Sequence, residues 1–264
     1  MKITSLTNPH VKQVVKLRDR TSRAETGLTI IDGIRELEMA FKAAVEGVEI
    51  FICPEILGPG NPGIIEKIGR SGVPLFETTQ EVFAKISYGD RQEGVLMVCR
   101  PKQLSFKDLK LNQAALVVVA ERIEKPGNLG AILRTCDSAG VNALIIADGL
   151  TDVYNPNVIR SSLGAVFTVA VVSSSNADAF QFLKDNGMKI LAAVPNAPTL
   201  YTRTDFKGAS AILVGNEQGG LTEFWMKKAD QKMAIPMQGA ADSLNVSATA
   251  AILVYEALRQ RGEG

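Results

Sequence analysis

The feature that most constrains this chain is a repeated alternation of short apolar runs with segments of helical periodicity. Two of the runs are AALVVVA at 114–120 and ALIIA at 143–147. Runs this apolar are typical of strands that are buried on both faces of a sheet. Strands that alternate with helices are typical of a parallel sheet with helices on both faces. We therefore expect an α/β fold.

The alternation occurs twice along the 264 residues, a length that allows two domains with separate cores. In the first half the apolar runs are LTII, VEIFIC, VPLF and GVLMVC, the last of which ends at residue 99. The stretch from Arg100 to Gln113 is polar and rich in lysine, as expected of a linker. We predict a smaller α/β domain over 1–100, a linker over 101–112 and a parallel-sheet domain over 113–264.

Composition argues against several classes of protein. No apolar stretch is long enough to span a bilayer, and the first residues lack the apolar core of a signal peptide, so we expect a cytoplasmic protein with no membrane partner. Cys53, Cys99 and Cys136 lie far apart, which fits neither a disulfide framework nor paired zinc ligands. His10 is the only histidine, so neither a catalytic triad nor a metal site is expected.

The first 23 residues are basic, although the whole chain carries a net charge of only +1. They contain six basic side chains and one acidic side chain, which gives a local charge of +5. Residues 8–20 have the spacing of an amphipathic helix with Lys12, Lys16 and Arg20 on a polar face. Such a face binds phosphates in some proteins and is merely hydrated in others, and the spacing does not separate these alternatives.

One glycine-rich segment formally matches a nucleotide-binding motif. The sequence GPGNPG at 58–63 satisfies the pattern G-x-G-x-x-G. That pattern works through backbone N–H groups aimed at a pyrophosphate. Pro59 and Pro62 lack this N–H group and are expected to resist the helix start that the motif requires. We therefore interpret the segment as a surface loop.

Three segments in the second half follow predicted strands, at the sheet edge where open α/β folds bind ligands. The first, at 121–140, opens a helix that carries Arg134 on its second turn, although a capped helix with a hydrated arginine is the alternative. The second, at 213–221, places Glu217 among glycines directly after a buried strand. An ordinary turn is the alternative there.

The third segment, at 235–251, leads from a Pro and Gly loop into the final, alanine-rich helix. Ser243 is predicted to be the N-cap of this helix, which would explain the serine without any ligand. Asn245 lies close to the positive end of the helix, where an anionic or polar ligand would be stabilised. The chemistry of these residues alone does not identify a reaction.

Together these segments resemble the signature motifs of the SpoU/TrmH family of RNA 2′-O-ribose methyltransferases, in the SPOUT superfamily. The resemblance is carried by the N-x-G-x-x-x-R run from Asn128 to Arg134, the GNE at 215–217, and IPM with SLNVSATAA between 235 and 251. A fourth segment, NPNVIRSSLGAVF at 155–167, is also similar to the family. Residues 1 to about 100 resemble its RNA-recognition domain.

The resemblance implies transfer of a methyl group from S-adenosyl-L-methionine to a ribose 2′-hydroxyl of RNA. It also implies a deep C-terminal trefoil knot and a homodimer with the final helix in the subunit contact. A separate first domain favours ribosomal RNA over transfer RNA as the substrate. The alternatives are a tRNA 2′-O-methyltransferase and a non-catalytic RNA-binding or ribosome-assembly factor.

By the same resemblance, Arg134 is the family's catalytic residue. A guanidinium stays protonated, so we expect it to clamp phosphate and ribose and not to act as a base. As further catalytic residues, we expect Asn128 and Glu217 to orient Arg134, and Ser243 and Asn245 to form hydrogen bonds with the ribose or the cofactor. The implied cofactor-binding residues are Val194, Leu213, Gly215, Asn216, Ile235, Met237 and Leu244. The candidate RNA-binding residues are Lys12, Lys16, Arg20, Arg23 and Arg160.

Overall fold

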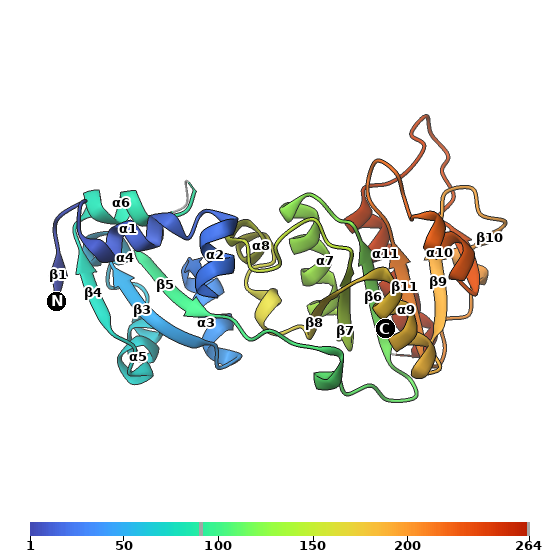
Figure 1. The fold of residues 1–264 in the computed structure, drawn as a ribbon, viewed down its shortest axis with the longest axis horizontal. Helices are drawn as coiled ribbons and strands as arrows, with labels where there is room; N and C mark the ends of the chain where they lie inside the picture. Colours follow the sequence, from blue (N-terminus) through green and yellow to red (C-terminus); the bar gives the residue numbers. More distant parts are fainter. Residues whose placement is uncertain (90–91, 263–264) are drawn as a thin grey trace. The chain divides into compact units, whose positions relative to one another are not determined.

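The computed structural model describes residues 1–89 and 92–262, which form two compact units (Figure 1). The N-terminal unit comprises Met1–Lys102 and Asp152–Thr168, and the C-terminal unit comprises Gln103–Thr151 and Val169–Gly264. Each unit contains a β-sheet with helices packed on it, so the predicted α/β class is confirmed. Within the two described ranges, no helix is long and apolar enough to cross a membrane.

The N-terminal unit is built on a five-stranded mixed sheet with the order β1-β4-β3-β5-β2. Its strands are β1 (Lys2–Ile3), β2 (Thr29–Asp32), β3 (Glu46–Ile52), β4 (Leu75–Thr78) and β5 (Val95–Arg100). β4 runs parallel to β1 and β3, whereas β5 runs antiparallel to β2 and β3. The four apolar runs of the first half therefore form strands, as predicted. β1 was not predicted, because two residues have no detectable periodicity.

The helices of this unit are α1 (Pro9–Lys16), α2 (Arg20–Thr26), α3 (Ile34–Lys42), α4 (Pro54–Leu57), α5 (Pro62–Ser71), α6 (Gln80–Ile86), α8 (Pro156–Ser161) and the 3-10 turn η2 (Ala165–Phe167). α1 buries Val11 and Val14 in a core cluster with Phe51 of β3. Lys12 and Lys16 are exposed. The predicted amphipathic helix is confirmed, although it ends at Lys16 and a second helix begins at Arg20.

The glycine-rich segment at 58–63 joins α4 to α5. A side chain added at Gly58, Gly60 or Gly63 would meet nothing within 4 Å, so this is an open surface loop, as predicted. The expectation that Pro62 resists a helix start was wrong, because Pro62 is the first residue of α5. The first N–H group of a helix has no intrahelical partner, so proline is well tolerated at that position.

Residues 152–168 belong to the N-terminal unit, although they lie between two strands of the other sheet in sequence. The Nε of Arg23 donates to Oδ2 of Asp152 at 2.7 Å, and Nη1 of Arg160 donates to the carbonyl of Tyr88 at 2.6 Å. The structure thus differs here from the predicted division of the chain. Periodicity identifies helices and strands, but it does not show which sheet a helix packs on.

Arg23 is buried and bound by other residues, which excludes its predicted contact with RNA. Only 6% of the residue is exposed. Besides its pairing with Asp152, its Nη1 donates to the carbonyls of Leu17 and Arg18 at 2.9 and 2.8 Å. A buried guanidinium held in this way joins the turn after α1 to the segment that begins at Asp152. The prediction is corrected, because local charge does not report burial.

The C-terminal unit contains a seven-stranded sheet with the order β10-β12-β9-β11-β6-β7-β8, in which every pair of neighbouring strands is parallel. Its strands are β6 (Leu116–Glu121), β7 (Ala143–Ala147), β8 (Val171–Ser174), β9 (Lys189–Ala193), β10 (Thr199–Leu200), β11 (Ser210–Val214) and β12 (Gln231–Ala234). Its helices are α7 (Pro126–Ser138), α9 (Asn176–Asp185), α10 (Glu223–Lys228) and α11 (Val246–Arg261), with 3-10 turns η1 (Phe106–Asp108) and η3 (Tyr201–Arg203). The predicted parallel sheet is confirmed.

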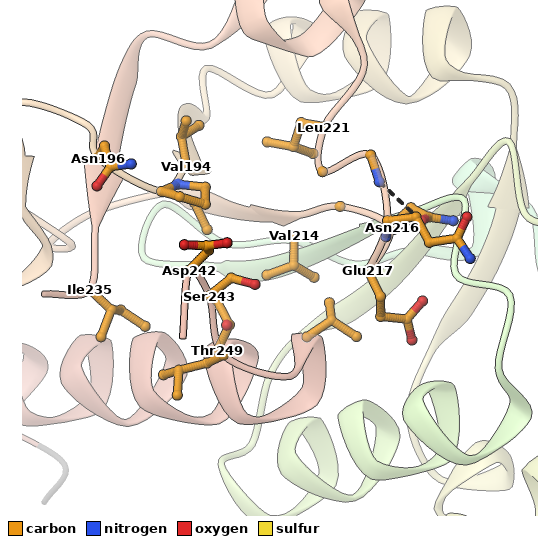
Figure 2. A pocket seen from close by; sticks show the side chains of 18 of the residues that line it. Val194, Asn196, Val214, Asn216, Glu217, Leu221, Ile235, Asp242, Ser243 and Thr249 are labelled. Atoms are coloured by element: carbon orange, nitrogen blue, oxygen red, sulfur yellow. Dashed lines mark hydrogen bonds between the residues drawn. The ribbon is translucent and has the colours of Figure 1, made fainter. Parts of the chain in front are cut away.

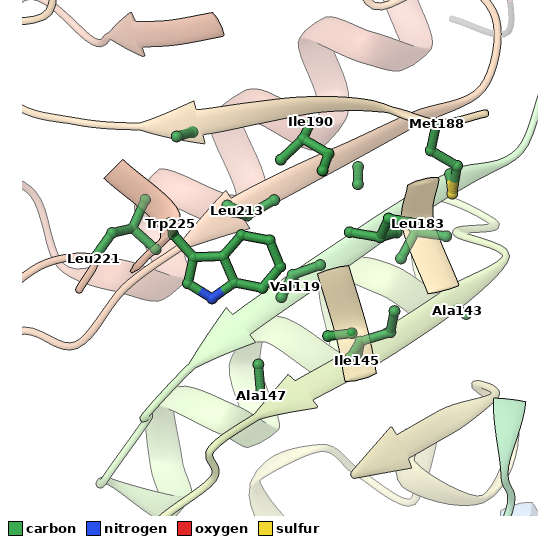
Figure 3. Packing of buried hydrophobic residues seen from close by; sticks show 14 of the residues in the cluster. Val119, Ala143, Ile145, Ala147, Leu183, Met188, Ile190, Leu213, Leu221 and Trp225 are labelled. Carbon is green, nitrogen blue, oxygen red and sulfur yellow. The ribbon is translucent and has the colours of Figure 1, made fainter. Parts of the chain in front are cut away.

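Both faces of this sheet are covered by helices, which explains why its strands are continuously apolar. α9 and α10 cover the face that carries Val119 and Leu213, and Trp225 of α10 is fully buried there (Figure 3). Val118 and Ile212 point to the opposite face, since side chains alternate along a strand, and they are also fully buried. α7 and α11 pack against each other there.

The predicted linker is ordered at its C-terminal end. Phe106 of η1 stacks on Phe182 of α9 with ring centroids 4.4 Å apart. Leu109 and Leu111 pack against the same core cluster. The lysines of this stretch suggested a solvated connection, but the apolar residues between them attach it to the C-terminal unit.

The strand order reverses at β6. From β6 the chain proceeds to β7 and β8 on one side of the sheet, and afterwards to β9, β11 and β12 on the other side. In a parallel sheet, the loops at the carboxyl ends separate where such a reversal occurs, and a crevice opens between them. The functional site should therefore lie beyond the carboxyl ends of β6 and β11 and of the strands next to β11.

The last helix begins two residues later than predicted. The N-cap of α11 is Asn245, whose Oδ1 accepts hydrogen bonds from the backbone N–H and the hydroxyl of Ser247 at 2.9 and 2.6 Å. Ser243 lies in the exposed loop before the helix. The prediction of Ser243 as the cap is corrected. Serine and asparagine are both good caps, so the sequence did not identify which one performs the role.

With Asn245 as the cap, two substitutions should change the free energy of unfolding by different amounts. Asn245→Ala should lower the free energy of unfolding by about 1 kcal/mol, because it removes the helix cap. Ser243→Ala should change it by less than about 0.5 kcal/mol, because an exposed loop hydroxyl is lost. Urea unfolding followed by far-ultraviolet circular dichroism measures both values. A larger loss for Ser243→Ala would contradict the assignment.

The three cysteines are buried as free thiols. Burial raises the pKa of the Cys136 thiol to about 12 and also raises the pKa of Cys99. Because the thiolate is the reactive form, we predict that none of the three reacts with Ellman's reagent at pH 8 in the folded protein and that all three react in denaturant. Rapid release of one equivalent of chromophore from the folded protein would contradict this.

Candidate functional site

A cleft of about 500 Å³ lies beyond the carboxyl ends of β9, β11 and β12 (Figure 2). Its lining residues come mainly from the ends of these three strands, from the loops that follow them and from the first turns of α11, with one residue from α10. Ile235 follows β12, Val194 follows β9 and Glu217 follows β11, so residues far apart in sequence face one space. A volume of this size is within the range of roughly 300–1,000 Å³ that small-molecule sites occupy.

The wall of the cleft is largely apolar. Val194, Leu221 and Ile235 line it together with the first residue of α11, Val246. Three methionines also contribute, namely Met226, Met233 and Met237. Aliphatic and thioether groups make dispersion contacts with flat aromatic rings, so this wall suits a heterocycle such as a purine.

The charged groups of the cleft are both acidic. Glu217 and Asp242 line it, and no lysine, arginine or histidine does so among the residues that the structure describes. Figure 2 shows Asp242 beside Ser243. Two carboxylates without a basic partner in the lining favour a ligand with positive charge and disfavour phosphate groups. The cleft is therefore unsuited to a nucleotide polyphosphate.

The turn after β11 is folded tightly on itself. A side chain at Gly215 would collide with the backbone of Gly220 and Leu221, so only glycine permits this approach of the two chain segments. The Oδ1 of Asn216 accepts from the N–H of Gln218 at 2.7 Å (Figure 2). The side chain of Asn216 thus stabilises the turn through a hydrogen bond. Asn216 also lines the cleft, as predicted for a cofactor-binding residue.

Three of the five predicted catalytic residues meet at one edge of the cleft. Nδ2 of Asn128 donates a hydrogen bond to Oε1 of Glu217. Nδ2 of Asn245 donates to Oδ1 of Asn128 at 3.2 Å. This chain of contacts joins the first turn of α7, the turn after β11 and the N-cap of α11. The three sequence segments that carry the family resemblance are thus in direct contact.

Arg134 is placed differently from these three residues. It lies exposed on α7, outside the cleft lining, and its guanidinium makes no hydrogen bond or ion pair with any residue that the structure describes. We expected Asn128 and Glu217 to orient it, but both are engaged with each other instead. The Arg134 guanidinium is therefore available to a group from outside this chain. Ser243, the fifth predicted catalytic residue, lines the cleft.

Six of the seven predicted cofactor-binding residues line the cleft, namely Val194, Gly215, Asn216, Ile235, Met237 and Leu244. Leu213 does not, because its side chain is fully buried in the core under α9 and α10. Val214, the next residue, lines the cleft instead. Side chains alternate along a strand, so a shift of one residue moves a side chain to the other face of the sheet.

Sequence reasoning missed several lining residues. Pro195 and Asn196 directly follow β9, so the rule that ligands bind at carboxyl ends of strands could have identified them. Asp242 and Thr249 had no such signal. Asp242 lies in a loop without periodicity, and Thr249 faces the cleft only because α11 begins at Val246.

The candidate RNA-binding residues lie in the N-terminal unit. Lys12, Lys16 and Arg20 are exposed on α1 and at the start of α2. Arg160 is only half-buried, but Nη1 donates to the carbonyl of Tyr88 and holds α8 in place. The three exposed residues are accessible to phosphate groups, and Arg160 is less exposed than they are.

Comparison with known proteins agrees with this geometry. Residues 115–255 match the SpoU rRNA Methylase family, and residues 8–97 match an MRM3-like substrate binding domain. The chain is 29% identical over 253 residues to the 23S rRNA (guanosine(2553)-2′-O)-methyltransferase RlmP of Bacillus subtilis (strain 168), with 96% of this chain and 97% of the relative covered.

Two solved structures extend the similarity to the whole fold. A crystal structure described as an RNA 2′-O ribose methyltransferase is 37% identical, with a TM-score of 0.87 and 99% of each chain covered. An AdoMet-bound rRNA methyltransferase from Sinorhizobium meliloti is 26% identical, with a TM-score of 0.89 and coverage of 98% of this chain and 97% of that chain. The chain therefore belongs to the SpoU rRNA methylase family.

Proposed function

We propose that this protein transfers a methyl group from S-adenosyl-L-methionine to a ribose 2′-hydroxyl of ribosomal RNA. The observation that carries the proposal is the contact of Asn128, Glu217 and Asn245 at the edge of an apolar, acidic cleft. The family match and the names of the relatives, which act on 23S rRNA or bind AdoMet, support the reaction and the cofactor.

The cleft has the chemical properties that this cofactor requires. Its methionine and aliphatic wall suits the adenine ring, and its volume of about 500 Å³ accommodates a ligand of this class. Glu217 and Asp242 supply negative charge, and the cofactor carries a positive sulfonium and a positive amino group. When bound, the cofactor supplies an electrophilic methyl group.

The residues of the chain have to place the ribose oxygen and help its proton to leave. Arg134 suits the first task, because a guanidinium makes paired hydrogen bonds with phosphate and ribose oxygens. As a permanently protonated group, it would stabilise negative charge that develops on the 2′-oxygen, and the proton would pass to a phosphate or to water. The hydrogen bonds among Asn128, Glu217 and Asn245 would fix the positions of the three segments around the site.

The RNA is proposed to be ribosomal. The names of relatives support this choice, as does a separate N-terminal unit with exposed Lys12, Lys16 and Arg20 on α1 and α2. Ribosomal RNA would be met in the cytoplasm, where we expect the protein to act.

The direct test is transfer of labelled methyl groups from S-adenosyl-L-methionine to purified ribosomal and transfer RNA, followed by alkaline hydrolysis. Alkali does not cleave beside a methylated 2′-oxygen. We expect label in alkali-resistant dinucleotides from ribosomal RNA. Label in mononucleotides would indicate base methylation, and label in the transfer RNA fraction alone would assign the other substrate. Cofactor binding without transfer to any fraction would favour an RNA-binding assembly factor.

Two variants should separate chemistry from cofactor binding. Arg134→Ala should lower turnover at least a hundredfold and change the cofactor Kd less than threefold, because Arg134 lies outside the cleft. Gly215→Val should weaken cofactor binding at least tenfold, because the added atoms collide with the turn. Ser138→Ala, on the exposed end of α7, is the matched control. Parallel loss of binding and turnover in Arg134→Ala would argue against a clamp.

We further propose a homodimer that uses α11. This helix has an exposed side on which Tyr255 is 51% accessible and Leu244, just before the helix, is 37% accessible, with small Ala248 between them. An exposed apolar stripe of this kind is typical of a subunit contact. Arg134 does not line the cleft of its own chain, so in a dimer it could act at the cleft of the partner subunit.

Sedimentation velocity tests the dimer. We expect a species of twice the 28.3 kDa chain mass at micromolar concentration. Tyr255→Glu should dissociate it, because a charge would be buried in the contact. A chain that sediments as a monomer throughout this range would refute the proposal.

We also propose that the C-terminal segment forms a trefoil knot, in which the last strands and the final helix thread through a loop of the same unit. The whole-chain similarity to SpoU-type structures and the packing of α11 against α7 support it. A chain that stays threaded in denaturant does not have to repeat the threading step when it refolds. Newly translated chain should therefore reach the folded state more slowly than denatured chain refolds.

A further inference from the structure

A buried carboxylate that the proposed reaction does not use lies next to the cleft. Glu121 is the last residue of β6, at the point where the strand order reverses, and its relative exposure is 0%. It is not part of the cleft lining. A carboxylate in such a position is strongly unfavourable unless hydrogen bonds compensate for the lost hydration, so its partners indicate what it does.

Both oxygens of Glu121 accept hydrogen bonds. Oε1 accepts from Nδ2 of Asn176 and from the hydroxyl of Thr222, each at 2.6 Å. Oε2 accepts from the backbone N–H of Thr222 at 2.8 Å. Asn176 in turn accepts from the indole N–H of Trp225 at 2.7 Å. Two of the three bonds to the carboxylate therefore come from one residue, Thr222.

Thr222 ends the tight turn that lines the cleft after β11. The other end of this turn is bound directly after β6, because Nδ2 of Asn216 donates to the carbonyl of Arg122 at 3.0 Å. Two consecutive residues, Glu121 and Arg122, thus anchor the two ends of the turn. The residues between the anchors, 217–221, all line the cleft.

We propose that Glu121 is a positioning residue for the cofactor, acting through Thr222 on the turn at 215–221. The inference rests on the proposed function. The turn contains three glycines and would lose much conformational entropy if it became ordered only when the ligand bound. Anchors at both ends hold it in its binding shape beforehand, and such preorganisation strengthens binding. The chemical step should be unaffected.

A purely structural role would also place a hydrogen-bonded carboxylate here, so the test has to separate the two roles. Thr222→Val keeps the shape of the side chain and removes its hydroxyl, whereas Thr222→Ser keeps the hydroxyl. The Thr222 side chain caps no helix N–H, so the valine variant removes no helix cap. Ser175→Ala is the control for stability, because it removes the cap of α9 but none of the groups that donate to Glu121.

Isothermal titration with S-adenosyl-L-methionine and methyl transfer at saturating cofactor are the two measurements. We expect Thr222→Val to raise the cofactor Kd three- to tenfold and Glu121→Gln at least tenfold, with kcat within twofold of the wild type. Thr222→Ser and Ser175→Ala should bind the cofactor within twofold of the wild type. Fluorescence of Trp225, the single tryptophan, verifies that each variant keeps its core.

Unchanged cofactor binding in Thr222→Val would overturn the inference, as would a variant that lost kcat and kept its Kd. A Ser175→Ala variant as weak in binding as Thr222→Val would assign the effect to stability and would also overturn it. If Glu121→Gln does not fold, the Thr222 pair still decides the matter. Failure of the proposed function can be distinguished from failure of the Glu121 proposal. If the wild-type protein binds no cofactor, the proposed function itself is refuted.

Discussion

The parallel sheet of the C-terminal unit determines where everything else in that unit can be. Its strands end at one edge, and β12, β9 and β11 are consecutive neighbours in the sheet, so the loops after these three strands face a common space. Helices on both faces remove the sheet from water and leave that edge as the place where polar groups can gather. The cleft is a consequence of this topology, and its chemistry comes from the few side chains that the loops contribute.

Short amide and carboxylate side chains connect these loops. Asn245 caps α11 and contacts Asn128, Asn128 contacts Glu217, and Asn216 closes its own turn. These side chains therefore form hydrogen bonds within their own segments and also connect different segments to each other. Behind them, Glu121 fastens the end of the turn from inside the core. A site built in this way is ordered before any ligand arrives, which favours tight binding of a small cofactor.

Much of the fold and part of the site could be predicted from sequence. Apolar runs identified the main strands, and the resemblance identified Asn128, Glu217 and Asn245, which the structure brings together. Predictions failed where burial or register decided the outcome. Arg23 is basic like its exposed neighbours but forms a buried pair, and Leu213 points to the opposite face of the sheet from its cleft-lining neighbour.

By itself, the sequence determined the α/β class, the parallel C-terminal sheet and the family, because periodicity and short motifs are properties of neighbouring residues. Only the tertiary structure decided which residue caps α11, that residues 152–168 pack on the N-terminal sheet, and that Glu121 and Thr222 meet. These outcomes depend on contacts between residues that are far apart in the chain. Periodicity and local propensity carry no information about such contacts, so only the folded packing reveals them.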